Sequence, residues 1–395
     1  MKKAASITPR HPLIGSLALL LPLCSQVQSA YTVTTLRSPT TYAMEATDMD
    51  NTGKVVGQTS VLAFAVTDTG SGLLTPTLKA RQQGAIWSAN TASSITGSKT
   101  ANYYVPFRIS EAGVTLGYKT SVADPNPGVK LFAEQGGTVT EVLTYREPYY
   151  LSELALGGTN KAGVVAATAW KSPGDDLIPF GATAVLLTGG AVSQLLERPA
   201  GVWGTYAHSV NDSGTVAGTI NGYTKTVTEG VDYNIQAAVW TDGKLSWVGP
   251  LQTEARVVNN AGQVLVAKGR SLPRSQEGGA NNWRYKDIAN PVKGSAWVML
   301  GNAMQTIGRD DQVVNATDMN NAGTVVGCVD NVPFIWKNGV LLDLVKEVNS
   351  KGAKLPSGVV VECPIAINDS GSILTSYRAR QSSTTRTWVR INAKP

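Results

Sequence analysis

A short sequence motif recurs seven times along this chain, and it constrains the fold more than any other feature. Each copy has an apolar run, the pattern Asn/Asp/Ser-x-x-Gly, and a second run of small apolar residues. The glycines of the pattern lie 48 to 61 residues apart, at Gly53, Gly113, Gly163, Gly214, Gly262, Gly323 and Gly371. A period of about 50 residues is typical of repeat architectures. We therefore predict one repeat array, with repeats starting near residues 45, 105, 155, 206, 254, 315 and 363.

The Asn/Asp/Ser-x-x-Gly element predicts a β-turn. Type I turns favour Asn, Asp or Ser at the first position and Gly at the fourth, where glycine tolerates a positive φ. The first side chain can also accept a hydrogen bond from the backbone two residues later. The seven first positions are Asp50, Ser110, Asn160, Asn211, Asn259, Asn320 and Asn368. The flanking runs are rich in Val, Ile, Thr and Ala, which favours strands.

A third strand is predicted in every repeat, and a fourth in several of them. The third contains apolar residues and often a Trp, over residues 85–87, 130–132, 184–186, 238–240, 296–297, 334–336 and 387–388. A fourth is clearest over residues 138–143, 191–196, 244–248 and 340–345. Each repeat is therefore predicted to be a four-stranded antiparallel meander of the size of a propeller blade.

The two ends of the chain suggest a closed ring. The seventh repeat stops after its third strand, and a spare strand stands at residues 31–36, before the first repeat. If that strand completes the last blade, closure removes exposed sheet edges that invite aggregation. We predict an all-β fold: a seven-bladed β-propeller of four-stranded antiparallel blades, forming a single domain over residues 30–395. An elongated β repeat array is the alternative.

The first 29 residues have the pattern of a secretion signal. Lys2, Lys3 and Arg10 accompany an apolar run over residues 13–23, which is too short to span a bilayer as a helix. We expect cleavage after residue 29 and a secreted or periplasmic protein with no membrane attachment. A lipid anchor at Cys24 is the weaker alternative, because Leu23 stands where such sites have a small residue.

Charge and cysteine content narrow the function classes. The formal charge of +6 falls to +3 without the three cations of residues 1–29, and no basic run is interleaved with aromatic residues. We therefore expect no nucleic-acid partner. After export only Cys328 and Cys363 remain. An even number of cysteines in an oxidising compartment favours a disulfide, with two buried thiols as the alternative.

The residue pattern of the repeat resembles the HAF repeat of bacterial extracellular proteins. Residues 46–57 together with 85–87 match its pattern, and residues 316–327 together with 334–336 match it best. Repeats two and three depart from it, and repeat three lacks the Trp. The resemblance covers nearly the whole chain after residue 29 and implies export and a repeated β architecture. The family has no agreed activity, so no catalytic residue is implied.

Candidate catalytic and metal-binding residues are few. His208 is the single histidine after residue 29. It could serve as a general acid or base if it faces the central channel, but we prefer a hydrogen-bonded structural histidine. The stretch from Asp48 to Gly53 faintly resembles a calcium loop without its Glu, and we interpret it as a turn. We expect no metal and no cofactor, since phosphate and dinucleotide motifs are also absent.

Loop length suggests a ligand site. The gap between turn glycine and third strand is long in repeats one and five, and such loops leave a propeller by the face that carries the connections between blades. The repeat-five insertion contains Asn282, Trp283, Arg284 and Tyr285, which offer a stacking plane and polar donors for a sugar. The alternative is that Trp283 packs against the edge of its blade and holds its own loop in place. Residues 145–150 have a similar composition.

These features predict an exported, non-enzymatic, monomeric repeat protein. It would act as a binding module for a polysaccharide or a cell-surface protein. The alternative is a carbohydrate-active enzyme, a polysaccharide lyase or hydrolase that works in a cleft on a propeller face. In that case His208 abstracts a proton next to a uronate carboxylate, or two carboxylates perform hydrolysis. No such carboxylate pair can be named from the sequence.

Overall fold

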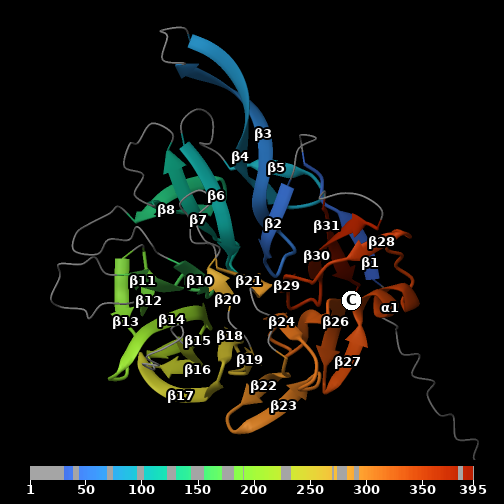
Figure 1. The fold of residues 1–395 in the computed structure, drawn as a ribbon. Coiled ribbons are helices and arrows are strands. Elements are labelled where there is room, and N and C mark those ends of the chain that lie inside the picture. Colours follow the sequence, from blue (N-terminus) through green and yellow to red (C-terminus); the bar gives the residue numbers. More distant parts are fainter. Residues whose placement is uncertain are drawn as a thin grey trace, which may run out of the picture.

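The chain folds into seven antiparallel sheets arranged as a ring (Figure 1). The computed structural model describes residues 31–38, 44–68, 74–95, 102–121, 130–143, 155–170, 182–189, 191–223, 233–268, 271–273, 283–288, 293–380 and 386–394. The predicted seven-bladed propeller is confirmed, and the elongated array is excluded. The secretion signal and the segment 145–150 lie outside the described residues.

The strands of each blade run outward from the axis in chain order. The innermost strands contact one another around the ring; they are β2 (Met44–Met49), β6 (Asn102–Ile109), β10 (Ala155–Thr159), β14 (Val202–Val210), β18 (Thr253–Val258), β24 (Val314–Met319) and β29 (Ala366–Ile367). The second strands are β3 (Val55–Asp68), β7 (Thr115–Ser121), β11 (Val165–Trp170), β15 (Val216–Tyr223), β19 (Val264–Lys268), β25 (Val325–Val329) and β30 (Ile373–Ala379).

The third and fourth strands complete the blades. The third strands are β4 (Leu74–Trp87), β8 (Lys130–Gln135), β12 (Ala182–Thr188), β16 (Tyr233–Thr241), β22 (Ala296–Leu300), β26 (Val332–Lys337) and β31 (Thr387–Ala393). The fourth strands of blades 1 to 6 are β5 (Ala92–Ser94), β9 (Thr138–Leu143), β13 (Ala191–Leu195), β17 (Lys244–Leu251), β23 (Ala303–Ile307) and β27 (Val340–Asp343).

The N-terminal strand closes the ring. β1 (Tyr31–Thr35) pairs with β31 from Tyr31↔Ala393 to Thr35↔Val389 and so forms the fourth strand of blade 7. A short strand, β28 (Val359–Val361), pairs with the outer part of β30. The predicted closure is therefore confirmed, with the two ends of the described chain in one sheet.

The predicted turns are confirmed at all seven repeats. Each turn glycine has a φ between 73° and 81°, and its N–H donates to the carbonyl of the first turn residue over 2.8–3.1 Å. The capping bond differs from the expectation. The first side chain accepts from the backbone N–H four residues later in every copy, over 2.8–3.0 Å. A bond from the backbone two residues later is added at Asp50 and Asn320.

The core lies between neighbouring blades and uses one repeated position. Trp87, Trp240 and Trp336 each pair with the first residue of the second strand in their blade. Each shares a core cluster with residues of the preceding blade. In blade 2 this position holds Glu134, and in blade 3 it holds Leu187. The aromatic residue that marks the third strand of repeat two in the sequence therefore lies two residues before the tryptophan position.

One helix interrupts the all-β pattern. α1 (Leu344–Ser350) follows β27 because Asp343 accepts a hydrogen bond from Lys346 N–H at 3.0 Å, as an N-cap does. The fourth strand predicted over residues 340–345 therefore ends at Asp343. With seven residues, α1 is too short to cross a bilayer, and no other helix in the described ranges could do so.

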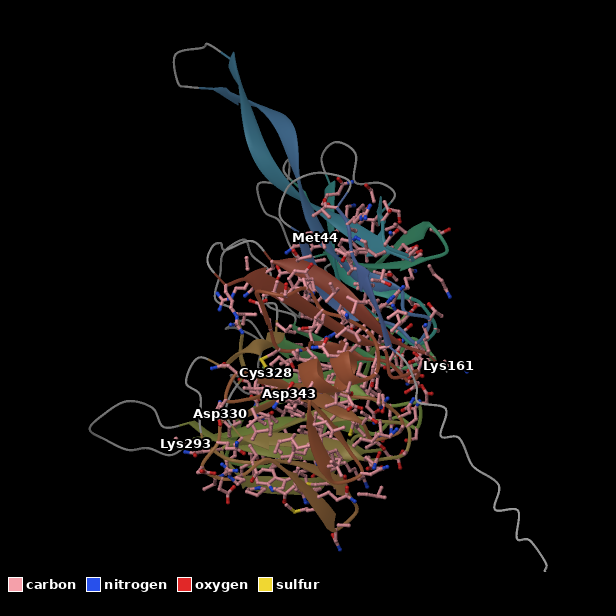
Figure 2. The ribbon with its side chains drawn as sticks, turned by 90° about the vertical axis from the view of Figure 1, so that its right-hand side faces the viewer. Met44, Lys161, Lys293, Cys328, Asp330 and Asp343 are labelled. Atoms are coloured by element: carbon pink, nitrogen blue, oxygen red, sulfur yellow. A yellow bond between two sulfur atoms is a disulfide. The ribbon has the colours of Figure 1, made fainter. Side chains whose placement is uncertain are left out.

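A disulfide and a long arm complete the fold. Cys328 on β25 is bonded to Cys363 before β29, so the predicted disulfide is confirmed and joins blade 6 to blade 7 (Figure 2). β3 and β4 stay paired as far as Asp68↔Leu74, although β2 pairs with β3 only over Val55–Thr59. This two-stranded arm projects from the ring (Figures 1 and 2).

Candidate binding site at the channel mouth

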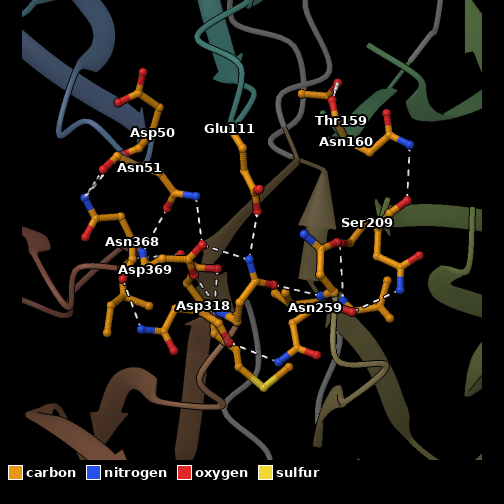
Figure 3. Close-up of a pocket in the computed structure, with 18 of the residues that line it drawn as sticks. Asp50, Asn51, Glu111, Thr159, Asn160, Ser209, Asn259, Asp318, Asn368 and Asp369 are labelled. Carbon is orange, nitrogen blue, oxygen red and sulfur yellow. Dashed lines mark hydrogen bonds between the residues drawn. The ribbon is translucent and has the colours of Figure 1, made fainter. Parts of the chain in front are cut away.

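The Asn/Asp/Ser-x-x-Gly turns of all seven blades meet around the axis at one face of the ring. They line a cavity of about 150 Å³, which we call the channel mouth (Figure 3). Its wall consists of the last residues of the innermost strands and the first two residues of the turns, except Ser110 in blade 2 and Lys161 in blade 3. Groups that are 48 to 61 residues apart in the sequence therefore become neighbours at one opening.

The first turn residues link the blades through what we call the amide ladder. The ladder consists of Asn160, Asn211, Asn259, Asn320 and Asn368. Each of these side chains donates its Nδ2–H to the backbone carbonyl of the first turn residue in the next blade, over 3.0–3.1 Å. The Oδ1 of the same amide caps its own turn. Asparagine is needed for both bonds, because a carboxylate has no N–H to donate.

The ladder has no amide at Asp50 or at Ser110, and blade 1 is joined to blade 2 differently. Asp48 Oδ2 accepts from Ile109 N–H at 3.0 Å. Lys54 Nζ donates to the Gly113 carbonyl at 3.3 Å and pairs with Glu134 at 3.7 Å. The Ser110 hydroxyl accepts from the backbone N–H of its own turn.

The second turn residues form a polar rim around the opening. The rim consists of Asn51, Glu111, Lys161, Asp212, Asn260, Asn321 and Asp369. From Lys161 to Asp369, each backbone N–H donates to the rim side chain of the following blade over 2.8–2.9 Å. Asn321 Nδ2 also donates to Asp369 at 2.8 Å and to Glu111 at 3.2 Å, which connects blade 6 to blade 2. The rim therefore presents amides and carboxylates in fixed positions.

Burial changes the acidity of three carboxyl groups at the mouth. Burial raises the pKa of Asp318 to about 7, and the nearby charge of Asp48 acts in the same direction. Burial also raises the pKa of Asp48, against the opposing effect of Arg108. The pKa of Glu111 is raised by its burial and by the rim carboxylates, while the bond from Asn321 lowers it. Asp318 is thus partly protonated at neutral pH.

His208 lies in β14 at a bulge and is 4% exposed. Its Nδ1–H donates to the Ala255 carbonyl in the next blade at 3.1 Å, and burial lowers its pKa. At the equivalent position Thr317 donates to Pro364 and Arg256 to Ala316, each in the next blade. The position therefore joins blades where it carries one of these polar side chains. His208 is not among the residues lining the channel mouth.

The repeat-five insertion reaches the axis. Trp283, Arg284 and Tyr285 lie on β21 (Trp283–Ile288), which pairs with β20 (Ser271–Pro273). β21 contacts β10 and β24, the innermost strands of blades 3 and 6, and lies at the centre of the ring (Figure 1). Asn282 lies outside the described residues. The ligand-binding role of these four residues stays a prediction.

Sequence reasoning missed the amide ladder, the rim and the two buried carboxyl groups. One signal was present: five of the seven first turn positions are Asn, although the turn accepts Asp and Ser equally well. A preference for Asn at that position indicates a second bond that uses the amide N–H. The electrostatic effect of Asp48 on Asp318 left no comparable signal, because the two residues lie 270 residues apart in the sequence.

Comparison with known proteins supports the fold. No protein-family model matches the chain, and no curated protein is similar to it in sequence. The β-propeller domain of the Trilobed protease from Pyrococcus furiosus has a TM-score of 0.54 at 11% identity, over 88% of this chain and 93% of that one. That domain is described as having an open velcro topology, whereas here β1 pairs with β31.

Two further solved structures are more distant. A puromycin-hydrolyzing peptidase from Mycobacterium tuberculosis has a TM-score of 0.48 at 11% identity, over 92% of this chain and 55% of that one. An alpha-L-arabinanase from Penicillium chrysogenum has a TM-score of 0.36 at 12% identity, over 92% and 98% of the two chains. At such scores and identities these likenesses carry no argument about activity.

Proposed function

We propose that the protein is an exported, non-catalytic propeller of the HAF-repeat type that binds a polysaccharide at the channel mouth. The rim carries this proposal. Its amides and carboxylates are held by hydrogen bonds between blades, so little side-chain freedom is lost when a ligand binds. Sugar hydroxyls donate and accept hydrogen bonds and thus match such a mixed set of groups. The disulfide and the repeat pattern support export.

A second candidate is a carbohydrate-active enzyme, and the pKa of Asp318 favours it. A carboxyl group that is protonated near neutral pH can serve as a general acid, and perturbed pKa values gather at functional sites. However, Asp318 accepts from the N–H groups of Met319 and Ile367 at 2.8 and 2.7 Å. The bond from Ile367 holds blade 6 against blade 7, which is a structural role, so we place the enzyme second.

The test uses the chain from residue 30 and a panel of acidic and neutral polysaccharides. Retention on each polymer, absorbance from unsaturated ends and new reducing ends are measured together. We expect retention without product. Glu111→Gln should weaken retention several-fold, because a charge-assisted bond to a hydroxyl becomes neutral. Asp311→Asn is the matched control, since Asp311 is 71% exposed and lies in the connection between blades 5 and 6, at the opposite face.

Other outcomes would redirect the proposal. Product formation that is lost in Asp318→Asn would establish the enzyme instead. Retention that survives Glu111→Gln but is lost in Trp283→Ala would move the site to β21. Failure to bind any polymer would reject the polysaccharide and leave a protein partner as the ligand.

A further inference from the structure

Blades 2 and 3 enclose a second cavity, of about 360 Å³, at the same face as the channel mouth. We call it the blade 2–3 socket. Its interior is apolar and includes Leu116 and Phe132 from blade 2 and Val165 and Leu187 from blade 3. Its polar lining includes Gln135 and Lys161. The socket therefore combines an apolar interior with one cation at its edge.

The repeat explains why this space is empty. Leu187 pairs with Val165 as Trp240 pairs with Val216, so Leu187 occupies the tryptophan position of blade 3. A leucine side chain is smaller than an indole, and the blade 2–3 interface therefore lacks the ring that fills the blade 3–4 interface.

The wall of the socket matches the surroundings of a tryptophan elsewhere in the ring. Trp240 is fully buried and shares a core cluster with Ala166 and Leu186 of blade 3. By strand register, the residues of blade 2 equivalent to these two are Leu116 and Ala133, and both line the socket. The same arrangement recurs in blade 6, where Trp336 shares a cluster with Leu265 and Val298 of blade 5.

Two further features keep the socket open. The amide ladder has no amide at Ser110, so it does not join blade 2 to blade 3 in the way that it joins the later blades. Gly163 and Gly189 both line the socket, and a Cβ at either would have no heavy atom within 4 Å. The opening is therefore wide enough for a group that comes from solvent.

We propose that the blade 2–3 socket binds a small aromatic carboxylate. A planar ring would take the place that the tryptophan side chain has in blades 1, 4 and 6. The carboxylate would meet the exposed ammonium group of Lys161. Glu111 interacts electrostatically with Lys161, but its carboxylate accepts a hydrogen bond from Asn321 at the channel mouth. This inference does not rest on the proposed polysaccharide site.

The test is a calorimetric titration of the chain from residue 30 with indole-3-acetate and with its uncharged amide. We expect both compounds to bind. Lys161→Ala should lower the affinity for the acid several-fold and leave the affinity for the amide unchanged. Leu187→Trp should fill the socket from within, keep or raise the melting temperature, and reduce the affinity for both compounds at least tenfold. Leu195→Trp is the matched control, because Leu195 lies on β13 of the same blade and is 49% exposed.

A second variant protects the test against misfolding. Leu186 of blade 3 is the residue equivalent to Ala133 of blade 2. Ala133→Leu therefore places the same side chain in blade 2. It should narrow the socket and lower the affinity for both compounds. The proposal is overturned if neither compound binds at millimolar concentration, or if binding survives both Leu187→Trp and Ala133→Leu in folded protein. Leu187→Trp and Ala133→Leu should leave polysaccharide retention unchanged, because neither residue lines the channel mouth, so failure at the channel mouth and failure at the socket are distinguishable.

Discussion

Single side chains decide how one blade is joined to the next. An asparagine at the first turn position caps its own turn with Oδ1 and bonds the following blade with Nδ2, as at Asn259, which reaches the Asn320 carbonyl at 3.0 Å. Asp50 caps its turn equally well but cannot continue the ladder. The chemistry of one amide nitrogen thus separates a local turn from a contact that holds the ring together.

Replacing that amide should destabilise the protein. In Asn259→Asp the capping acceptor stays, but the donor to Asn320 is lost and a carboxylate is buried against a carbonyl. We expect the free energy of unfolding to fall by about 1–3 kcal/mol, measured by urea unfolding. Asp50→Asn exchanges the same two residues in the opposite direction at an equivalent position and should change stability little. Equal stability of both variants and the wild type would contradict a structural role for the ladder.

The protonation of Asp318 should make stability depend on pH. Its pKa in the folded protein is about 7, whereas an aspartate in an unfolded chain has a pKa of about 3.9. Between these values the folded state binds more protons, so the free energy of unfolding falls as pH rises and levels off above about pH 7. Asp48 shifts in the same direction, and Arg108 opposes both.

Asp318→Asn removes the titration at this position. Its single amide oxygen can keep only one of the two bonds from Met319 and Ile367, which reach different carboxylate oxygens, but that loss is the same at every pH. Between pH 5 and pH 8 the free energy of unfolding of the wild type should fall by roughly 2–4 kcal/mol more than that of the variant. Melting temperatures of the two proteins across this range provide the measurement. Parallel curves would show that the carboxyl group has an ordinary pKa.

At the scale of elements, blades 6 and 7 are joined by a disulfide, a side-chain hydrogen bond and a helix. The disulfide joins Cys328 on β25 to Cys363, three residues before β29, with Cα atoms 5.3 Å apart. Thr317 Oγ1 also donates to the Pro364 carbonyl at 2.7 Å. Helix α1 lies between these two blades and buries Leu344 and Val348 in a core cluster that includes residues of both blades. Blade 7, which both chain ends build, is thus tied firmly to its neighbour.

Removing the disulfide should lower stability without changing the fold. The double substitution Cys328→Ser and Cys363→Ser should reduce the free energy of unfolding by about 2–4 kcal/mol, as for a typical native disulfide. Urea unfolding with and without reductant provides the measurement. In reductant, the free energy of unfolding of the wild type should fall to nearly that of the variant, whereas the stability of the variant should not change. A variant as stable as the oxidised wild type would contradict this expectation.

At the scale of the whole molecule, closure depends on β1. It supplies the fourth strand of blade 7 and pairs with β31 over five residues. Without β1, the backbone of β31 would be an open edge, which is a template for pairing with other chains. The ring therefore depends on a contact between residues about 360 positions apart.

Deletion of residues 31–36 should therefore cause concentration-dependent association and a lower melting temperature. Light scattering and thermal unfolding provide the measurements. A synthetic peptide of residues 31–36 should restore the monomer in part, because an added strand can complete an open sheet edge. A peptide with the same composition in scrambled order is the control. A deletion variant that stays monomeric at full stability would show that three strands suffice for blade 7.

The sequence by itself determined the repeats, the turns, the strands, the closing strand and the disulfide partners. These features depend on residues within one repeat, or on a cysteine count that leaves a single pairing. The amide ladder, the rim, the raised pKa of Asp318 and the blade 2–3 socket were decided by the tertiary structure. Each depends on which blades become neighbours and how deeply a group is buried, as when Asn368 bonds the Asp50 carbonyl 318 residues away. A turn pattern encodes its own hydrogen bonds, but desolvation and empty space exist only after the ring has closed.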